Sequence, residues 1–164
     1  GVDVARANGL EHAIGSTGSR SEAAAKDRYN LPTIALLDMG DFVGGLLKYL
    51  RRHPIPKITI AGGFAKMLKL GQGSTDLHST RSQVNFDALA TLAAPIGFDN
   101  HTVRNANTVL EVIDMANIEQ RRVLANIIAK AAHATALKTL SNAPIIVEIM
   151  VVGRDSKCWG SAGG

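Results

Sequence analysis

The segment GSTGS, residues 15–19, combines glycines with three hydroxyl side chains and stands just before a helix-forming stretch, residues 20–29. Backbone N–H groups at the start of a helix bind carboxylate, phosphate or ribose oxygens. Ser16, Thr17, Gly18 and Ser19 could therefore contact such oxygens. A capped turn without a ligand is the alternative, because Ser, Thr and Gly are the usual turn residues. The segment matches neither G-x-G-x-x-G nor G-x-x-x-x-G-K-[ST], so it carries no nucleotide fingerprint.

A second segment, Met39–Asp41 (MGD), places a carboxylate at the predicted start of a helix. Asp41 could simply be the N-cap of that helix. Acidic residues after sheet strands also accept hydrogen bonds from ribose. Asp41, next to Gly40, could therefore accept hydrogen bonds from a ribose or an adenine amino group.

The third segment pairs close backbone approach with positive charge. Gly62 and Gly63 leave room for a ligand beside the backbone, and Lys66 and Lys69 follow them on one face of a predicted helix. This arrangement suits a polyanionic ligand, although a solvated basic face would have the same residues.

The fourth segment, residues 76–81, gathers Asp76, His78, Ser79 and Arg81. His78 could act as a general base or bind a metal, but one His and one Asp make a weak metal signal, and we predict no metal centre. Ser79 lies in no G-x-S-x-G motif, which argues against a hydrolase. Cys158 has no nearby base, so we expect no catalytic thiol.

Continuous apolar runs predict the strands, and apolar residues at helical spacing predict the helices, that position these segments. Three strand–loop–helix units in succession predict an α/β fold, a parallel or mostly parallel sheet with helices on both faces and Rossmann-like units. The loops then lie at the carboxyl ends of strands, where open α/β sheets bind ligands. We expect strands at 10–14, 33–37, 57–61 and 145–152, and helices at 20–29, 42–52, 64–70, 84–94 and around Asn117 in 108–140.

Composition excludes several classes of protein. The 164 residues are 46% hydrophobic, which fits one domain, and we place it at 1–152 with a flexible tail at 153–164. No apolar run is long enough to cross a bilayer, so we expect no membrane span. A net charge of +4 and an aromatic content of 4% argue against nucleic acid as a partner. The single cysteine favours a reducing compartment, and we expect the cytoplasm.

The four segments together resemble the CbiD family of anaerobic cobalamin biosynthesis. Residues 62–79 read GGFAKMLKLGQGSTDLHS, against a family motif of approximately G-H-I-G-K-L-I-K-L-A-A-G-x-x-N-T-H-S, and Met39–Gly44 and Gly15–Ser19 match two further motifs in order. The chain departs from the motif at Gly63, where the family has His, and at Asp76 and Leu77. Family members are much longer, so the chain looks like a C-terminal portion without the family's N-terminal domain.

The resemblance implies a methyltransferase that uses S-adenosylmethionine to methylate C-1 of the cobalt-corrinoid cobalt-precorrin-5B, with cobalt present only in this substrate. It suggests donor contacts at 16–19 and 40–41, and a role for His78 in orienting a carboxylate or removing a proton. The substrate would lie against Gly62, Gly63, Lys66, Lys69, Asp76, Ser79 and Arg81. Whether the protein forms a homo-oligomer is left open.

Two other functions compete with this interpretation. A module that binds a nucleotide or a corrinoid without catalysis would have the same loops. An NAD-type oxidoreductase on a doubly wound sheet is weakened by the absence of G-x-G-x-x-G.

Overall fold

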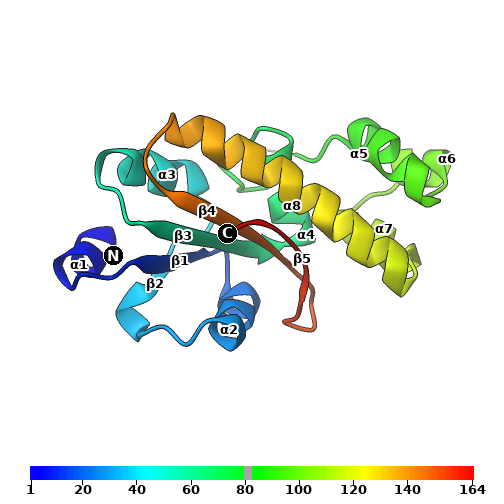
Figure 1. Cartoon of the computed structure of the whole chain (residues 1–164). Coiled ribbons are helices and arrows are strands. Elements are labelled where there is room, and N and C mark those ends of the chain that lie inside the picture. Colours follow the sequence, from blue (N-terminus) through cyan, green and yellow to red (C-terminus); the bar gives the residue numbers. More distant parts are fainter. Residues whose placement is uncertain (80–82) are drawn as a thin grey trace.

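The computed structural model describes residues 1–79 and 83–164, and it is built around a sheet with the strand order β2-β1-β3-β4-β5 (Figure 1). The first four strands are parallel, and β5 runs antiparallel to β4. The strands are β1 (His12–Ser16), β2 (Leu36–Asp38), β3 (Lys57–Gly63), β4 (Ile146–Val152) and β5 (Cys158–Gly163). The predicted α/β class, with a mostly parallel sheet, is confirmed.

Helices cover both faces of this sheet (Figure 1). The α-helices are α1 (Val2–Ala7), α2 (Ser19–Arg28), α3 (Val43–Arg52), α4 (Phe64–Gly71), α5 (Phe86–Ala93), α6 (Asn100–Arg104), α7 (Val109–Met115) and α8 (Ile118–Leu140), with 3-10 turns η1 (Thr33–Ala35) and η2 (Ala94–Ile96). The larger core lies on the side of α3, α4 and α8, where alternate residues Ile58 and Ile60 of β3 are buried. A smaller core lies under α2, around Ile14 and Met150.

Three elements of the structure differ from the sequence prediction. The apolar run 33–37 is a strand only from Leu36 onward, because η1 occupies its first residues. Helix α1 was not predicted, and α6 lies between the helices predicted at 84–94 and in 108–140, where no element was predicted. The helical pair around Asn117 is confirmed, since the Asn117 side chain accepts a hydrogen bond from the Gln120 N–H at the start of α8.

The flexible tail predicted for residues 153–164 is wrong. Those residues form a turn and then β5, which pairs with β4 and packs against α8. Glycine makes this approach possible, because a Cβ at Gly160 would lie only 2.5 Å from the backbone carbon of Ala125. Apart from Trp159, the sequence CWGSAG lacks the bulky apolar residues that mark a strand, because small residues are needed there.

A buried polar network anchors the end of α2 to the sheet. The Glu148 carboxylate of β4 is buried and accepts hydrogen bonds from the Tyr29 hydroxyl at 2.8 Å and from the Thr59 hydroxyl at 3.0 Å. Arg28 lies 3.5 Å from the same carboxylate, and His12 bonds to Thr59 at 2.8 Å. Since a buried carboxylate must be paired, this network fixes the position of α2.

No helix in the described ranges combines the length and the apolar character that a bilayer crossing needs.

Candidate functional site

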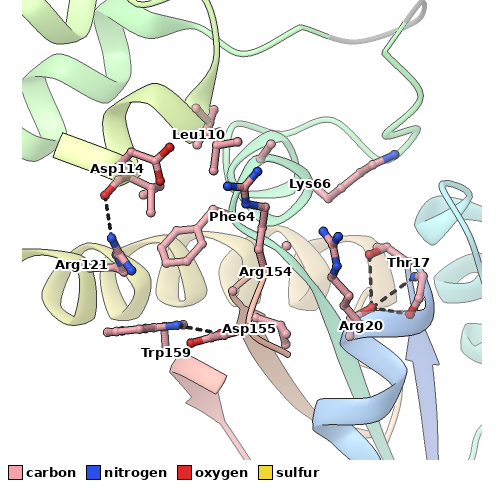
Figure 2. A pocket seen from close by; sticks show the side chains of 18 of the residues that line it. Thr17, Arg20, Phe64, Lys66, Leu110, Asp114, Arg121, Arg154, Asp155 and Trp159 are labelled. Atoms are coloured by element: carbon pink, nitrogen blue, oxygen red, sulfur yellow. Dashed lines mark hydrogen bonds between the residues drawn. The ribbon is translucent and has the colours of Figure 1, made fainter. Parts of the chain in front are cut away.

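A cavity of about 690 Å³ lies at the carboxyl edge of the sheet, where the segments that follow three of the strands meet (Figure 2). The segments after β1, β3 and β4 form one side of it, through residues 17–21, 63–66 and 152–155. The opposite wall comes from α7, α8 and β5, through Val109, Leu110, Ile113, Asp114, Arg121 and Trp159. This is the edge at which parallel sheets bind ligands.

The connection after β1 presents the start of α2 to the cavity. Gly18 is the residue before the helix, and its N–H donates to the Ser21 hydroxyl, which in turn donates to the Gly18 carbonyl at 2.9 Å. The Ser21 hydroxyl therefore caps the start of α2. Thr17, Gly18 and Ser19 all line the cavity, next to N–H groups that the first helical turn leaves unpaired.

The connection after β3 contributes Gly63, Phe64 and Lys66 to the cavity. The Lys66 ammonium is paired with the carboxylate of Asp41, which lies outside the cavity lining. Lys66 thus joins α4 to the β2–α3 connection. Among the described ion pairs, this is the one that connects the cavity to another loop.

Several residues predicted to bind ligands do not line the cavity and instead pack against the segments that do. Ser16 is buried, and its carbonyl accepts a hydrogen bond from the N–H of Gly40, whose φ is 55°. A Cβ at Gly62 would lie 2.6 Å from the Met67 methyl carbon and 3.0 Å from Thr17. Gly62 therefore allows the β1 connection and α4 to lie against each other. Ligand contacts from Ser16, Gly40, Asp41 and Gly62 stay predictions.

The segment 74–79 also lies outside the cavity lining, held against α3 and α4. The Leu77 N–H donates to the Asp41 carbonyl, and the Leu77 carbonyl accepts from the Lys69 ammonium at 3.3 Å. Burial, with the charge of Lys66 as a smaller cause, lowers the pKa of Lys69. Asp76 accepts from the His78 N–H at 3.1 Å, which makes a local turn. Site roles for Lys69, Asp76, His78 and Ser79 stay predictions, and Arg81 lies outside the described residues.

Most of the charged residues that line the cavity, and the aromatic Trp159, were not predicted from the sequence. The missed residues are Arg20, Asp114, Arg121, Arg154, Asp155 and Trp159. Arg154 and Asp155 follow β4 directly, so the strand–loop pattern could have marked them if the tail had not been taken as flexible. No sequence pattern distinguishes Arg121 as a cavity residue, because it is one of many charged residues on helices.

Two further features concern metal and thiol chemistry. In the described part of the chain, no group of three or more His, Cys, Asp or Glu side chains is arranged to hold a metal ion. Cys158 is half-buried in β5, its thiol donates to the Gly160 carbonyl, and burial raises its pKa. A thiol with a raised pKa is a poor nucleophile at neutral pH.

Comparison with known proteins decides the family. The family model described as "CbiD, C-terminal domain" matches residues 76–163. The chain belongs to the CbiD family. The resemblance found in the sequence is therefore confirmed, and the CbiD motif at 62–79 corresponds to the end of β3, α4 and the segment that α4 anchors. No solved structure matches the chain.

Curated relatives extend the CbiD assignment over most of the chain. A protein of Brucella anthropi named cobalt-precorrin-5B C(1)-methyltransferase is 54% identical over 157 residues, which are 94% of this chain and 42% of the relative. A Methylorubrum extorquens protein with the same name is 51% identical over 158 residues, covering 94% of this chain and 44% of that protein. The chain thus spans less than half the length of these CbiD relatives.

The position where the CbiD motif has His faces the cavity. Gly63 lines it, and a Cβ built there would meet only the Val152 carbonyl, at 3.9 Å. The described surroundings of Gly63 therefore leave space for a Cβ at this position.

Proposed function

We propose that this chain is the ligand-binding portion of a methyltransferase that transfers a methyl group from S-adenosylmethionine to C-1 of cobalt-precorrin-5B. The observation that carries this proposal is the 54% identity to a Brucella anthropi relative of that name, together with a cavity at the edge of the sheet that the fold uses for ligands. The cavity volume of about 690 Å³ is typical of sites for small molecules.

The residues around the cavity fit both ligands. The hydroxyl groups of Thr17 and Ser19, with the N–H groups of the first turn of α2, suit the carboxylate and ribose oxygens of the donor. Four basic and two acidic side chains line the same cavity, so its lining is net positive, as a substrate edged with carboxylates requires. Phe64, Leu110 and Ile113 supply apolar surface for a ring system.

The donor supplies a methyl group already activated on a sulfonium, so the protein has little acid or base chemistry to perform. Its work is to align the two ligands and exclude water. The apolar residues Phe64 and Ile113 exclude water from the cavity, and the start of α2 orients the donor. His78 would orient a substrate carboxylate or take up a proton when the substrate extends over the segment 74–79.

The test is a chimera in which this chain replaces the corresponding residues of the Brucella anthropi relative. Incubated with S-adenosylmethionine and cobalt-precorrin-5B, the chimera should raise the mass of the corrinoid by one methyl group, as the unaltered relative does. A folded chimera that binds both ligands without methyl transfer would overturn the proposal and favour the non-catalytic binding module.

The placement of the donor is tested by NMR on the chain itself. Titration with S-adenosylhomocysteine should shift the amide signals of Gly18 and Ser19, because both line the cavity. Shifts confined to residues 74–79 would show that the donor lies elsewhere. Full turnover of the chimera with His78→Ala would remove His78 from the reaction.

We also propose a cytoplasmic location and a small-molecule partner without nucleic acid or membrane. The support is the biosynthetic substrate named for the relatives and the single cysteine, Cys158, for which the chain has no disulfide partner. Fractionation of cells that express the tagged protein tests the location, and sedimentation velocity tests for a homo-oligomer.

A further inference from the structure

We propose that Arg121, with Arg154 and Arg20, binds the peripheral carboxylates of the corrinoid substrate. The inference rests on the proposed function and adds to it the residues that recognise the substrate. It assigns substrate recognition to arginines of α2, the β4–β5 turn and α8, which line both sides of the cavity and lie outside the CbiD motif at 62–79.

The guanidinium of Arg121 is held in place but is not fully hydrogen-bonded. Its Nη2 donates to the Ile113 carbonyl at 3.2 Å, and its Cζ lies 5.0 Å from the centre of the Trp159 ring. Its Nε is buried and has no acceptor among the described residues. Because leaving a buried donor unsatisfied costs free energy, the site favours a ligand that supplies an acceptor or draws the guanidinium toward it.

Arg20 and Arg154 line the same cavity, and in Figure 2 both project into it from the side of the sheet. Neither they nor Arg121 form an ion pair with a carboxylate among the described residues. Unpaired guanidinium groups around one cavity fit an anion, and guanidinium binds carboxylate through paired hydrogen bonds.

The acidic residues of the cavity do not neutralise this group. Asp155 accepts hydrogen bonds from the Trp159 indole N–H at 3.3 Å and from the Lys157 N–H at 3.1 Å. It therefore serves to orient Trp159. Asp114 lines the cavity and forms no ion pair among the described residues.

The number and arrangement of the arginines select the substrate over the donor. Three guanidinium groups come from three separate elements, α2, the β4–β5 turn and α8. A donor with one carboxylate can pair with one of them, whereas a ring with carboxylates around its edge can reach several. Trp159 and Phe64 provide aromatic surface beside the arginines.

Trp159 gives a direct readout, because it is the only tryptophan of the chain and lies in the cavity. The probe is cobyrinic acid, a cobalt corrinoid with free carboxylates, and the control ligand is cobinamide, in which amides replace them. Cobyrinic acid should quench the Trp159 fluorescence of the 164-residue chain at lower concentration than cobinamide does.

The variants Arg121→Gln and Arg154→Gln should each weaken cobyrinic acid binding about ten-fold or more, the range for loss of a charge-assisted hydrogen bond. Arg122→Gln is the matched control, since Arg122 lies on the same helix, pairs with Glu119 and does not line the cavity. Arg154 lies in an exposed turn, so its variant keeps the test valid if Arg121→Gln disturbs Trp159.

Equal binding of cobyrinic acid by the Arg121, Arg154 and Arg122 variants would overturn the inference. So would variants that weaken S-adenosylhomocysteine binding and leave cobyrinic acid binding unchanged. The proposed function fails separately, when the chimera with unaltered arginines transfers no methyl group.

Discussion

Gly44 and Gly45 are neighbours in α3 with opposite surroundings. A Cβ at Gly44 would lie 2.7 Å from the Cβ of Thr75, whereas nothing lies within 4 Å of a Cβ at Gly45. The Gly44 N–H also donates to the Thr75 carbonyl at 2.8 Å. Gly44 therefore allows the segment 74–79 to lie directly on the helix.

We predict that Gly44→Ala lowers the free energy of unfolding by about 1–3 kcal/mol, because the segment must move away. Gly45→Ala should raise it by about 0.5–1 kcal/mol, since alanine favours a helix and meets no neighbour. Urea unfolding of the two variants checks both signs. Equal effects at the two positions would contradict the close contact with Thr75.

His12 makes stability depend on pH. Burial, with the positive charge of Lys57 as a smaller cause, holds its pKa below the ordinary value of 6.5. The unfolded chain then binds a proton at a pH where the folded chain does not, so this contribution to stability is present above pH 6.5 and is lost as the pH falls toward the folded-state pKa.

We predict that His12→Gln shows a smaller loss of unfolding free energy than the unaltered chain when the pH is lowered from about 8 to about 5. Urea unfolding at a series of pH values measures this difference. An NMR titration of the His12 ring gives an independent check, and protonation at or above pH 6.5 would contradict the prediction.

At the scale of elements, β5 is a strand that the usual sequence patterns do not predict. Its Gly160 meets the backbone of α8, and its Gly163 meets the Val147 carbonyl of β4 and the His133 ring of α8. Packing therefore requires small residues where strand prediction relies on large ones. Ser161 also donates its N–H to the Asn126 side chain of α8 at 3.1 Å. Contacts with β4 and α8 thus stabilise β5 more than the β-propensity of its own residues does.

We predict that Gly160→Ala lowers the free energy of unfolding by about 2 kcal/mol or more, because the neighbouring atoms at 2.5 Å include the backbone of Ala125 and Asn126, which cannot turn aside. Ser161→Ala is the control, as the hydrogen bond it makes to Asn126 uses its backbone N–H. Thermal unfolding compares the two variants, and similar midpoints would refute the packing argument.

The strand–loop–helix units could be predicted because their buried strands are continuous apolar runs and their helices have amphipathic spacing. The same order predicted which loops meet at the carboxyl edge, and Thr17, Gly18, Ser19, Gly63 and Lys66 do line the cavity. The opposite wall could not be predicted. It depends on how α7 and α8 lie across the sheet, which local sequence patterns do not encode.

At the scale of the whole molecule, the cavity joins residues that are far apart in the chain, from Thr17 at one end to Trp159 at the other. A ligand there contacts α2, α4, α7, α8 and β5 together. Binding should therefore stabilise the whole fold rather than one loop. The Brucella anthropi CbiD relative is more than twice as long as the region that it shares with this chain.

Lys66 lines the cavity, and its ammonium group is also paired with the Asp41 carboxylate outside the cavity. An anion in the cavity and the Asp41 carboxylate compete for Lys66, and the Asp41 carbonyl also holds Leu77 of the segment 74–79. Anion binding and the docking of that segment are then thermodynamically linked, and each must affect the other to the same extent.

Asp41→Asn should release Lys66 toward the cavity and tighten cobyrinic acid binding several-fold, with a steeper dependence on salt. The same fluorescence titration measures this change. Weaker binding of S-adenosylhomocysteine by the variant would show instead that Asp41 contacts the donor. If cobyrinic acid binding tightens, the position of the segment 74–79 depends on whether an anion occupies the cavity, although the segment does not line the cavity.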